Sequence, residues 1–359
     1  MATAGTTVTS LSSAVSRRVV GSVCFVLVTT ALAASIATNP LLLEPAARGL
    51  RDAGVFTDVA APVARALRVL GAVATVGALT MALLAGANRH PGRAASLKVA
   101  AARWALLWAL AAASSLVLEL SQVSGLPVAE VLRGAGAGAA SGIAAQVTGL
   151  ALTAWLAALV SFFSRRVESV PGLRVVLLTA AVALVVPVLT GHSGHAGFNP
   201  LALVALSLHV VAVSAWVGGL LALCAHADRQ ARADVMLLRR FSAMALVCYV
   251  VVAASGVANL FARLTWAELA ESGPYGVLLL LKVAGFLALG GFGLAHRRRT
   301  LRRMSAGEGA SFWSLAAVEV AMMAAVLGLA VTLTATAPGP NDDALHAAGA
   351  SSAVHFTMP

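Results

Sequence analysis

The residues of this chain best suited to bind a metal are three histidines that lie close together in the sequence. His192 and His195 are three residues apart in an uncharged, glycine-rich segment, Thr190–Pro200. His209 lies about nine residues into the next apolar run, a depth of about 13 Å along a helix. Imidazole is the commonest metal ligand and binds copper, zinc, iron and nickel. The pattern predicts a metal site with two ligands in a loop and a third deeper in the membrane.

Each of these histidines also has a structural interpretation. Two loop histidines are often only polar loop residues, and a neutral imidazole inside a membrane can be held by a neighbouring helix. An ionisable group at membrane depth is rare and usually functional, which favours a role for His209. Trp216 lies seven residues further on, on the same helical face.

Four other polar side chains in apolar runs are candidates for a pathway or for internal bracing: Glu119, Asn259, Lys282 and Glu319. A buried lysine needs a partner, because an uncompensated charge is costly in a low-dielectric interior. Glu119 and Lys282 lie at similar depth from one side of the membrane, so we expect them to pair. Glu319 lies toward the opposite side and is expected to pair with the Arg297–Arg303 cluster.

Sulfur ligands are also present in the apolar runs. Met81, Met322 and Met323 lie at mid-membrane depth, and thioethers suit Cu(I), although methionine in a helix usually serves packing. Cys224 and His226 share one end of a run and could form an exit site. No two cysteines form a Cys-x-x-Cys pair, so the sequence predicts neither a disulfide framework nor a thiolate zinc site.

Composition defines the kind of protein that positions these groups. Hydrophobic residues make up 60%, charged residues 11%, and the mean hydropathy is +0.90. A soluble domain carries about 25% charged residues, so most of this chain is expected to face a lipid bilayer. The net charge of +11 does not indicate nucleic-acid binding, because the basic residues form short clusters between apolar runs.

The apolar runs predict an all-α, polytopic transmembrane bundle. Each run has room for a helix that spans the bilayer. There are about nine: 19–37, 69–87, 104–120, 143–163, 173–190, 201–225, 242–262, 276–295 and 313–335. The first is expected to be a retained anchor, because its length exceeds that of a signal peptide's apolar region. The longest loop, about 38–68, has room for a short interfacial helix.

The distribution of lysine and arginine predicts the orientation. Eighteen of them flank the runs on one side of the membrane, six on the other, and Lys282 lies within a run. The positive-inside rule places the larger set in the cytoplasm. We therefore expect a multi-pass protein of the cytoplasmic membrane, with the N-terminus inside and both the C-terminus and the 190–200 loop outside.

Several short motifs, in order, resemble the copper-resistance D (CopD) family of bacterial membrane proteins. The resemblance is closest from Phe241 to Pro338 and covers about 190–338. It rests on Gly191-His192, His209, Trp216-x-Gly218-Gly219, Phe241-Ser242, Ser255-Gly256, Tyr275-Gly276, Lys282, Glu319 and Thr334–Pro338. One departure is His296–Arg299, where an Asn-Arg pair is more usual.

The resemblance implies copper handling, with copper ions imported across the cytoplasmic membrane beside an extracytoplasmic copper-binding partner. It divides the chain into N-terminal helices (1–189), CopD-like helices with the preceding histidine loop (190–338) and a short outer tail (339–359). A haem- or quinone-linked electron carrier and a copper-oxidase assembly factor remain alternatives. No nucleophile motif, phosphate loop or carboxylate pair indicates an enzyme.

Overall fold

The structure is a computed structural model that describes eight parts of the chain. These are positions within 21–33 (21–23, 25, 26, 29, 30 and 33), then 53–86, 91–134, 143–190, 200–226, 234–261, 273–303 and 310–333. Helices are the regular secondary structure of these parts, which contain no strand, and this confirms the all-α prediction. The loop with His192 and His195 lies outside them.

The helices follow the predicted apolar runs closely. They are α2 (Val55–Ala85), α3 (Pro91–Ser124), α4 (Val128–Leu132), α6 (Ala144–Ser164), α7 (Val170–Thr190), α8 (Pro200–Ala225), α9 (Asp234–Phe261), α11 (Gly273–Arg303) and α12 (Ala310–Leu333). In the described part of the chain, seven helices are long and apolar enough to cross a membrane, from α2 to α11 without α4. In α12 the apolar stretch is shorter, Val318–Ala330. The structure thus shows a multi-helix membrane bundle but does not confirm the count of nine.

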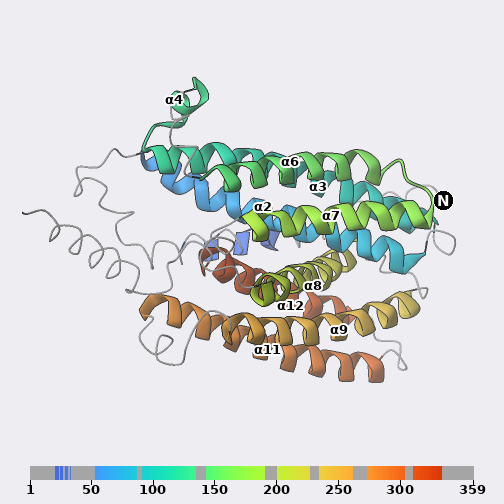
Figure 1. The fold of residues 1–359 in the computed structure, drawn as a ribbon. Coiled ribbons are helices and arrows are strands. Elements are labelled where there is room, and N and C mark those ends of the chain that lie inside the picture. The colour runs from blue at the N-terminus through green and yellow to red at the C-terminus, as the bar shows by residue number, and fades with distance from the viewer. Residues whose placement is uncertain are drawn as a thin grey trace, which may run out of the picture.

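Helix α2 lies at the centre of the bundle. It contacts α3, α7, α8, α9 and α12, and Figure 1 shows α6 on one side of it and α9 and α11 on the other. Its backbone comes very near that of α8: a Cβ atom added to Gly77 would lie 1.9 Å from the carbonyl carbon of Gly218. Glycine on both helices is therefore what lets the two backbones cross at this distance.

Helix α2 begins within the segment 38–68, which was predicted to be a loop. Gly54 precedes it with φ of 90°, and the helix starts at Val55 instead of near residue 69. The hydroxyl groups of Thr57 and Ser121 lie 3.0 Å apart, so the first turn of α2 packs against the end of α3. Arg65 and Arg68 consequently lie within a helix and not in a loop.

Basic side chains at the other end of the bundle, predicted to be cytoplasmic, hold helix ends in place. Arg240 of α9 donates to the carbonyl of Leu84 in the last turn of α2, with a distance of 2.9 Å from Nη1 to oxygen. Lys98 of α3 donates to the carbonyl of Val167 at 2.9 Å. The last carbonyl groups of a helix lack intrahelical partners, so these contacts satisfy groups that would otherwise need water.

Candidate functional site

His209 of α8 lies against α9 in the half of the bundle that the charge distribution places outside. Its Nδ1 atom is 3.1 Å from the Ser255 hydroxyl. That hydroxyl is also 2.5 Å from the carbonyl oxygen of Val251, one turn back on α9. Because a serine hydroxyl has one hydrogen and the carbonyl can only accept, the network assigns the proton on Nδ1 to the imidazole. The lone pair of Nε2 then remains available for a metal.

Residues of α9 and α11 also lie near the imidazole. Lys282 of α11 lies close enough to act on His209 electrostatically, so three helices contribute polar side chains here. Gly256 lies beside the ring: a Cβ atom at this position would be 3.7 Å from Cε1 of His209. Asn259 follows one turn after Ser255 on α9 and is partly buried. Lys282, which was predicted to pair with Glu119, thus lies within electrostatic range of His209.

An aromatic layer lies beneath His209, on the side toward the predicted cytoplasm. Trp216 of α8 makes edge-to-face contacts with Tyr249 of α9 and Phe286 of α11, with ring centroids 5.5 and 6.4 Å apart. Tyr249 and Phe286 stack at 4.3 Å. The Tyr249 hydroxyl occupies the space beside Gly290, where a Cβ atom would lie 2.1 Å away from it. Trp216 thus packs against α9 and α11 through these two rings.

Sulfur atoms lie in the core below the aromatic layer. Met81 and Met323 are buried in the main apolar cluster, and Met244 and Met322 pack against it. Cys248 Sγ is 3.4 Å from Met244 Sδ on the same face of α9. These side chains form the apolar core, as methionine usually does, and they also place soft ligand atoms inside it.

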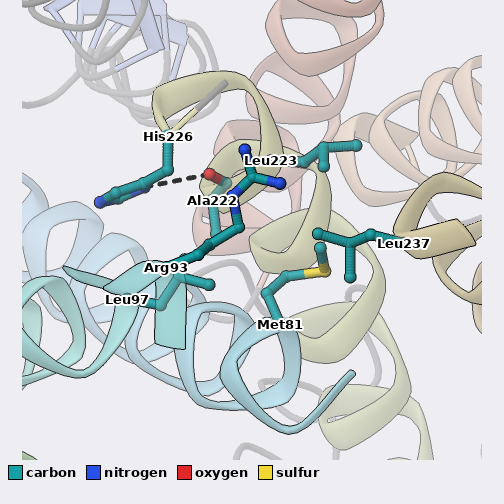
Figure 2. A pocket seen from close by; sticks show the side chains of 7 residues that line it. All are labelled: Met81, Arg93, Leu97, Ala222, Leu223, His226 and Leu237. Carbon is teal, nitrogen blue, oxygen red and sulfur yellow. Dashed lines mark hydrogen bonds between the residues drawn. The ribbon is translucent and has the colours of Figure 1, made fainter. Parts of the chain in front are cut away.

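The predicted cytoplasmic end of α8 carries His226. Figure 2 shows its ring bonded through Nδ1 to the Ala222 carbonyl, at 3.0 Å, in a pocket that Met81 and Arg93 also line. Burial lowers the pKa of His226 below its ordinary value of 6.5, and the charge of Arg93 acts in the same direction, whereas the bond to Ala222 opposes it. The imidazole therefore favours its neutral form, which is the form that binds metals.

Glu319 and Cys224 lie near this end too. Glu319 of α12 is buried, acts electrostatically on Cys224 of α8, and lies near Gly293 of α11. The side chains of the Arg297–Arg303 cluster, its predicted partners, lie outside the described residues.

Glu119 has different partners from those that its depth suggested. Its Oε2 atom accepts a hydrogen bond from Nε2 of Gln146 on α6, at 2.7 Å, and it interacts electrostatically with Arg68 of α2. The pairing with Lys282 was thus wrong. Depth alone does not define a neighbour: Glu119 faces α2 and α6, whereas Lys282 lies on α11 beside His209.

The site differs from a preformed metal centre. Within the described ranges, no group of three or more His, Cys, Asp and Glu side chains could hold one ion. Sequence reasoning found His209 and Lys282 but missed Ser255, Tyr249 and Phe286. The Ser255-Gly256 motif was noted only as part of a resemblance, and nothing in the spacing indicated that its hydroxyl faces His209.

The fold and this arrangement define a multi-pass α-helical membrane protein with a histidine-centred polar site in its C-terminal helices. Residues 235–333 match the family described as Copper resistance protein D (CopD), which confirms the predicted resemblance of the C-terminal helices to that family. The match contains α11, α12 and all of α9 except Asp234, and therefore Ser255, Lys282 and Glu319, but not α8 with His209. Comparisons with curated proteins and with solved structures gave no match.

Proposed function

We propose that this protein imports copper ions across the cytoplasmic membrane and is not an enzyme. The observation that carries the proposal is the bond between His209 and Ser255. It gives an intramembrane imidazole an oriented ring and a free Nε2 lone pair, beside helices that belong to a copper-resistance family. Metal-binding histidines usually donate their second ring N–H to a protein acceptor in this way.

The donors between the two membrane faces form a sequence of positions. An ion that arrives from outside meets His192 and His195 of the predicted outer loop, and then His209. Beyond the aromatic layer lie the sulfur atoms of Met244 and Cys248. Because an unliganded charge in an apolar interior is very costly, transfer between successive ligands is the physically accessible route.

The inner end supplies the last positions of this route. Cys224 and Glu319 lie near each other, and His226 and Met81 line one pocket. The positive charge of Arg93 in the same pocket opposes prolonged binding of a cation, which suits release toward the cytoplasm. An extracytoplasmic copper-binding protein would deliver the ion at the opposite end.

The aromatic layer is the barrier in this route. Trp216, Tyr249 and Phe286 offer no lone pair of the kind that copper prefers, although aromatic faces attract cations. Phe286 lies on α11, whose apolar surface is mostly exposed, so a displacement of α11 is the smallest change that separates the rings. Lys282 lies one turn before Phe286 on α11 and would move with it.

Copper accumulation in cells tests the role of His209. His209→Ala should abolish accumulation at normal protein levels, and Ser255→Ala should reduce the apparent affinity about tenfold or more by freeing the ring. Ser207→Ala is the matched control, because the Ser207 hydroxyl bonds only to Leu203 of its own helix. Wild-type accumulation by His209→Ala would contradict the proposed path.

A metal analysis of the purified protein separates this function from the alternatives. We expect bound copper by mass spectrometry and a visible spectrum without a Soret band. A Soret band would indicate the haem-linked carrier instead. Bound copper without time-dependent uptake into proteoliposomes would favour an assembly factor.

The proposed direction depends on orientation, which cysteine labelling in intact cells tests. In a variant without the native cysteines, Ser193→Cys should react with a membrane-impermeant thiol reagent, because the charge distribution places the 190–200 loop outside. Thr300→Cys should react only after the cells are permeabilised. The opposite pattern would place the histidine loop in the cytoplasm.

A further inference from the structure

A second polar cluster lies on α2, α3 and α6, toward their predicted outer ends. It contains Arg65 and Arg68 of α2, Ser115 and Glu119 of α3, and Gln146 of α6. Two of its contacts are direct hydrogen bonds: Gln146 donates to Glu119 at 2.7 Å, and Arg65 donates to Gln122 at 2.8 Å. None of these positions lies in the segment that matches the copper-resistance family.

Two buried donors in this cluster have no hydrogen-bond acceptor among the residues that the structure describes. They are Nε of Arg68 and the hydroxyl of Ser115, a residue that is only 1% exposed. Helical hydroxyl groups elsewhere in the chain, such as those of Ser114, Ser124 and Thr153, bond to the carbonyl four residues back. Ser115 does not, so its hydroxyl is left for a partner outside its own helix. Buried donors of this kind indicate a bound water or ion.

The register of α2 and α3 brings these donors together. The contacts Thr57–Ser121 and Gly71–Trp108 show that the two helices run antiparallel, with Ser115 at the level of residues 63–65. Helical side chains lean toward the N-terminus of their helix. Arg68 therefore reaches toward the level of Ser115 from one helix, and Glu119 reaches toward it from the other. Glu119 and Ser115 are four residues apart and share a face of α3.

The charges of the cluster decide what kind of ligand fits. Arg65 and Arg68 carry two positive charges against the single negative charge of Glu119. The Glu119 carboxylate interacts with Arg68 electrostatically, but the described residues offer the Nε atom of Arg68 no hydrogen-bond acceptor. The ligand must therefore accept hydrogen bonds and compensate one positive charge.

We propose that Arg68 and Ser115 bind a small monovalent anion, a halide or a short carboxylate, that enters from the extracytoplasmic side. Arg68 supplies the charge and the N–H donors, and Ser115 supplies an O–H donor. Glu119, oriented by Gln146, prevents a larger or doubly charged anion from binding, because it places a negative charge beside the site. The anion joins α2 to α3 and stabilises their outer ends.

Anion-dependent thermal stability of the full-length protein in detergent tests this site. Chloride is titrated against gluconate at constant ionic strength, and formate is titrated in the same way. The unfolding temperature of the wild type should rise with chloride and reach saturation, since a ligand that binds only the folded state stabilises it. Ser115→Ala should weaken the apparent affinity about tenfold, because it removes a hydrogen bond to a charged ligand. Arg68→Gln should remove the response.

Ser114→Ala is the matched control, because it removes a neighbouring hydroxyl that is already bonded to Leu110. It should respond to chloride as the wild type does. If Arg68→Gln does not fold, the chloride response of the unfolding temperature can still be compared between Ser115→Ala and Ser114→Ala. A weaker response in Ser115→Ala alone would support the site. Equal stability of the wild type in chloride and gluconate would show that the donors bind water only, and equal responses in all variants would show a general salt effect. Either result would overturn the proposal without affecting the copper path.

Discussion

The central helix α2 and the C-terminal helix α11 are both long and apolar, but the protein surrounds them very differently. In the most apolar window of α2, 67% of the residues are buried inside the protein, compared with 11% in that of α11. Exposed leucine and valine side chains, among them Leu280 and Leu287, cover α11. Most of the groups suited to copper lie on α8 and α9, whose apolar windows are 44% and 22% buried, whereas α2 serves as the fixed scaffold. Regions that must move are generally drawn from the less tightly packed parts of a fold.

The largest expected effect on stability comes from a substitution at the contact between Gly77 of α2 and Gly218 of α8. Gly218→Leu would drive a side chain into the α2 backbone, where even a Cβ atom would lie 1.9 Å from the Val73 oxygen. We expect a loss of about 3 kcal/mol or more, or no folded protein. Gly291→Leu on α11 is the control, since no atom lies within 4 Å of its Cβ position. Similar yields and melting temperatures for the two variants would show that α2 is no more sensitive to added volume than α11.

The sequence predicted the helices better than it predicted their contacts. The run 143–163 corresponds to Ala144–Ser164 and the run 201–225 to Pro200–Ala225, because a bilayer imposes both length and apolarity. The start of α2 was missed because the turns before residue 69 contain polar groups, such as Thr57, whose burial depends on a partner from α3. Hydropathy carries no information about such a partner.

The same limit explains the outcome at the candidate site. His209 and Trp216 were found because their spacing places them on one face of a single helix. The partners of Glu119 and His209 could not be found, since they depend on which helices are neighbours and how each is rotated. Serine is common in membrane helices, so a single sequence does not indicate that Ser255 contacts His209.

An intermediate effect on stability is expected for substitutions of Glu119, Arg68 and Lys282. Glu119→Gln and Arg68→Met should show a coupling of about 1–3 kcal/mol in a double-mutant cycle, because they interact within the scaffold. Glu119→Gln and Lys282→Met should be additive within about 0.5 kcal/mol, because Lys282 lies beside His209 instead. Chemical unfolding in detergent measures both cycles. Strong coupling to Lys282 would restore the pairing that depth alone suggested.

The smallest effect concerns the pH dependence of stability at His226, in the pocket where the inner end of α8 packs against α2 and α3. The pKa of His226 is lowered by burial and then by Arg93, so the unfolded chain binds a proton more readily than the folded protein does. Stability should therefore decrease as the pH falls through about 6.5, the ordinary value, and His226→Gln should reduce this dependence. Thermal unfolding between pH 8 and 5.5 measures the slope. An unchanged slope in the variant would assign the dependence to other groups.

The crossing of Gly77 and Gly218 also has a consequence for biogenesis. The two glycines are far apart in the chain, so α2 enters the membrane long before the helix that covers its glycine face has been synthesised. Until α8 follows, that face has only lipid or the insertion machinery as a neighbour. A chain truncated before α8 should therefore be bound by membrane chaperones and degraded quickly, whereas one truncated after α9 should persist.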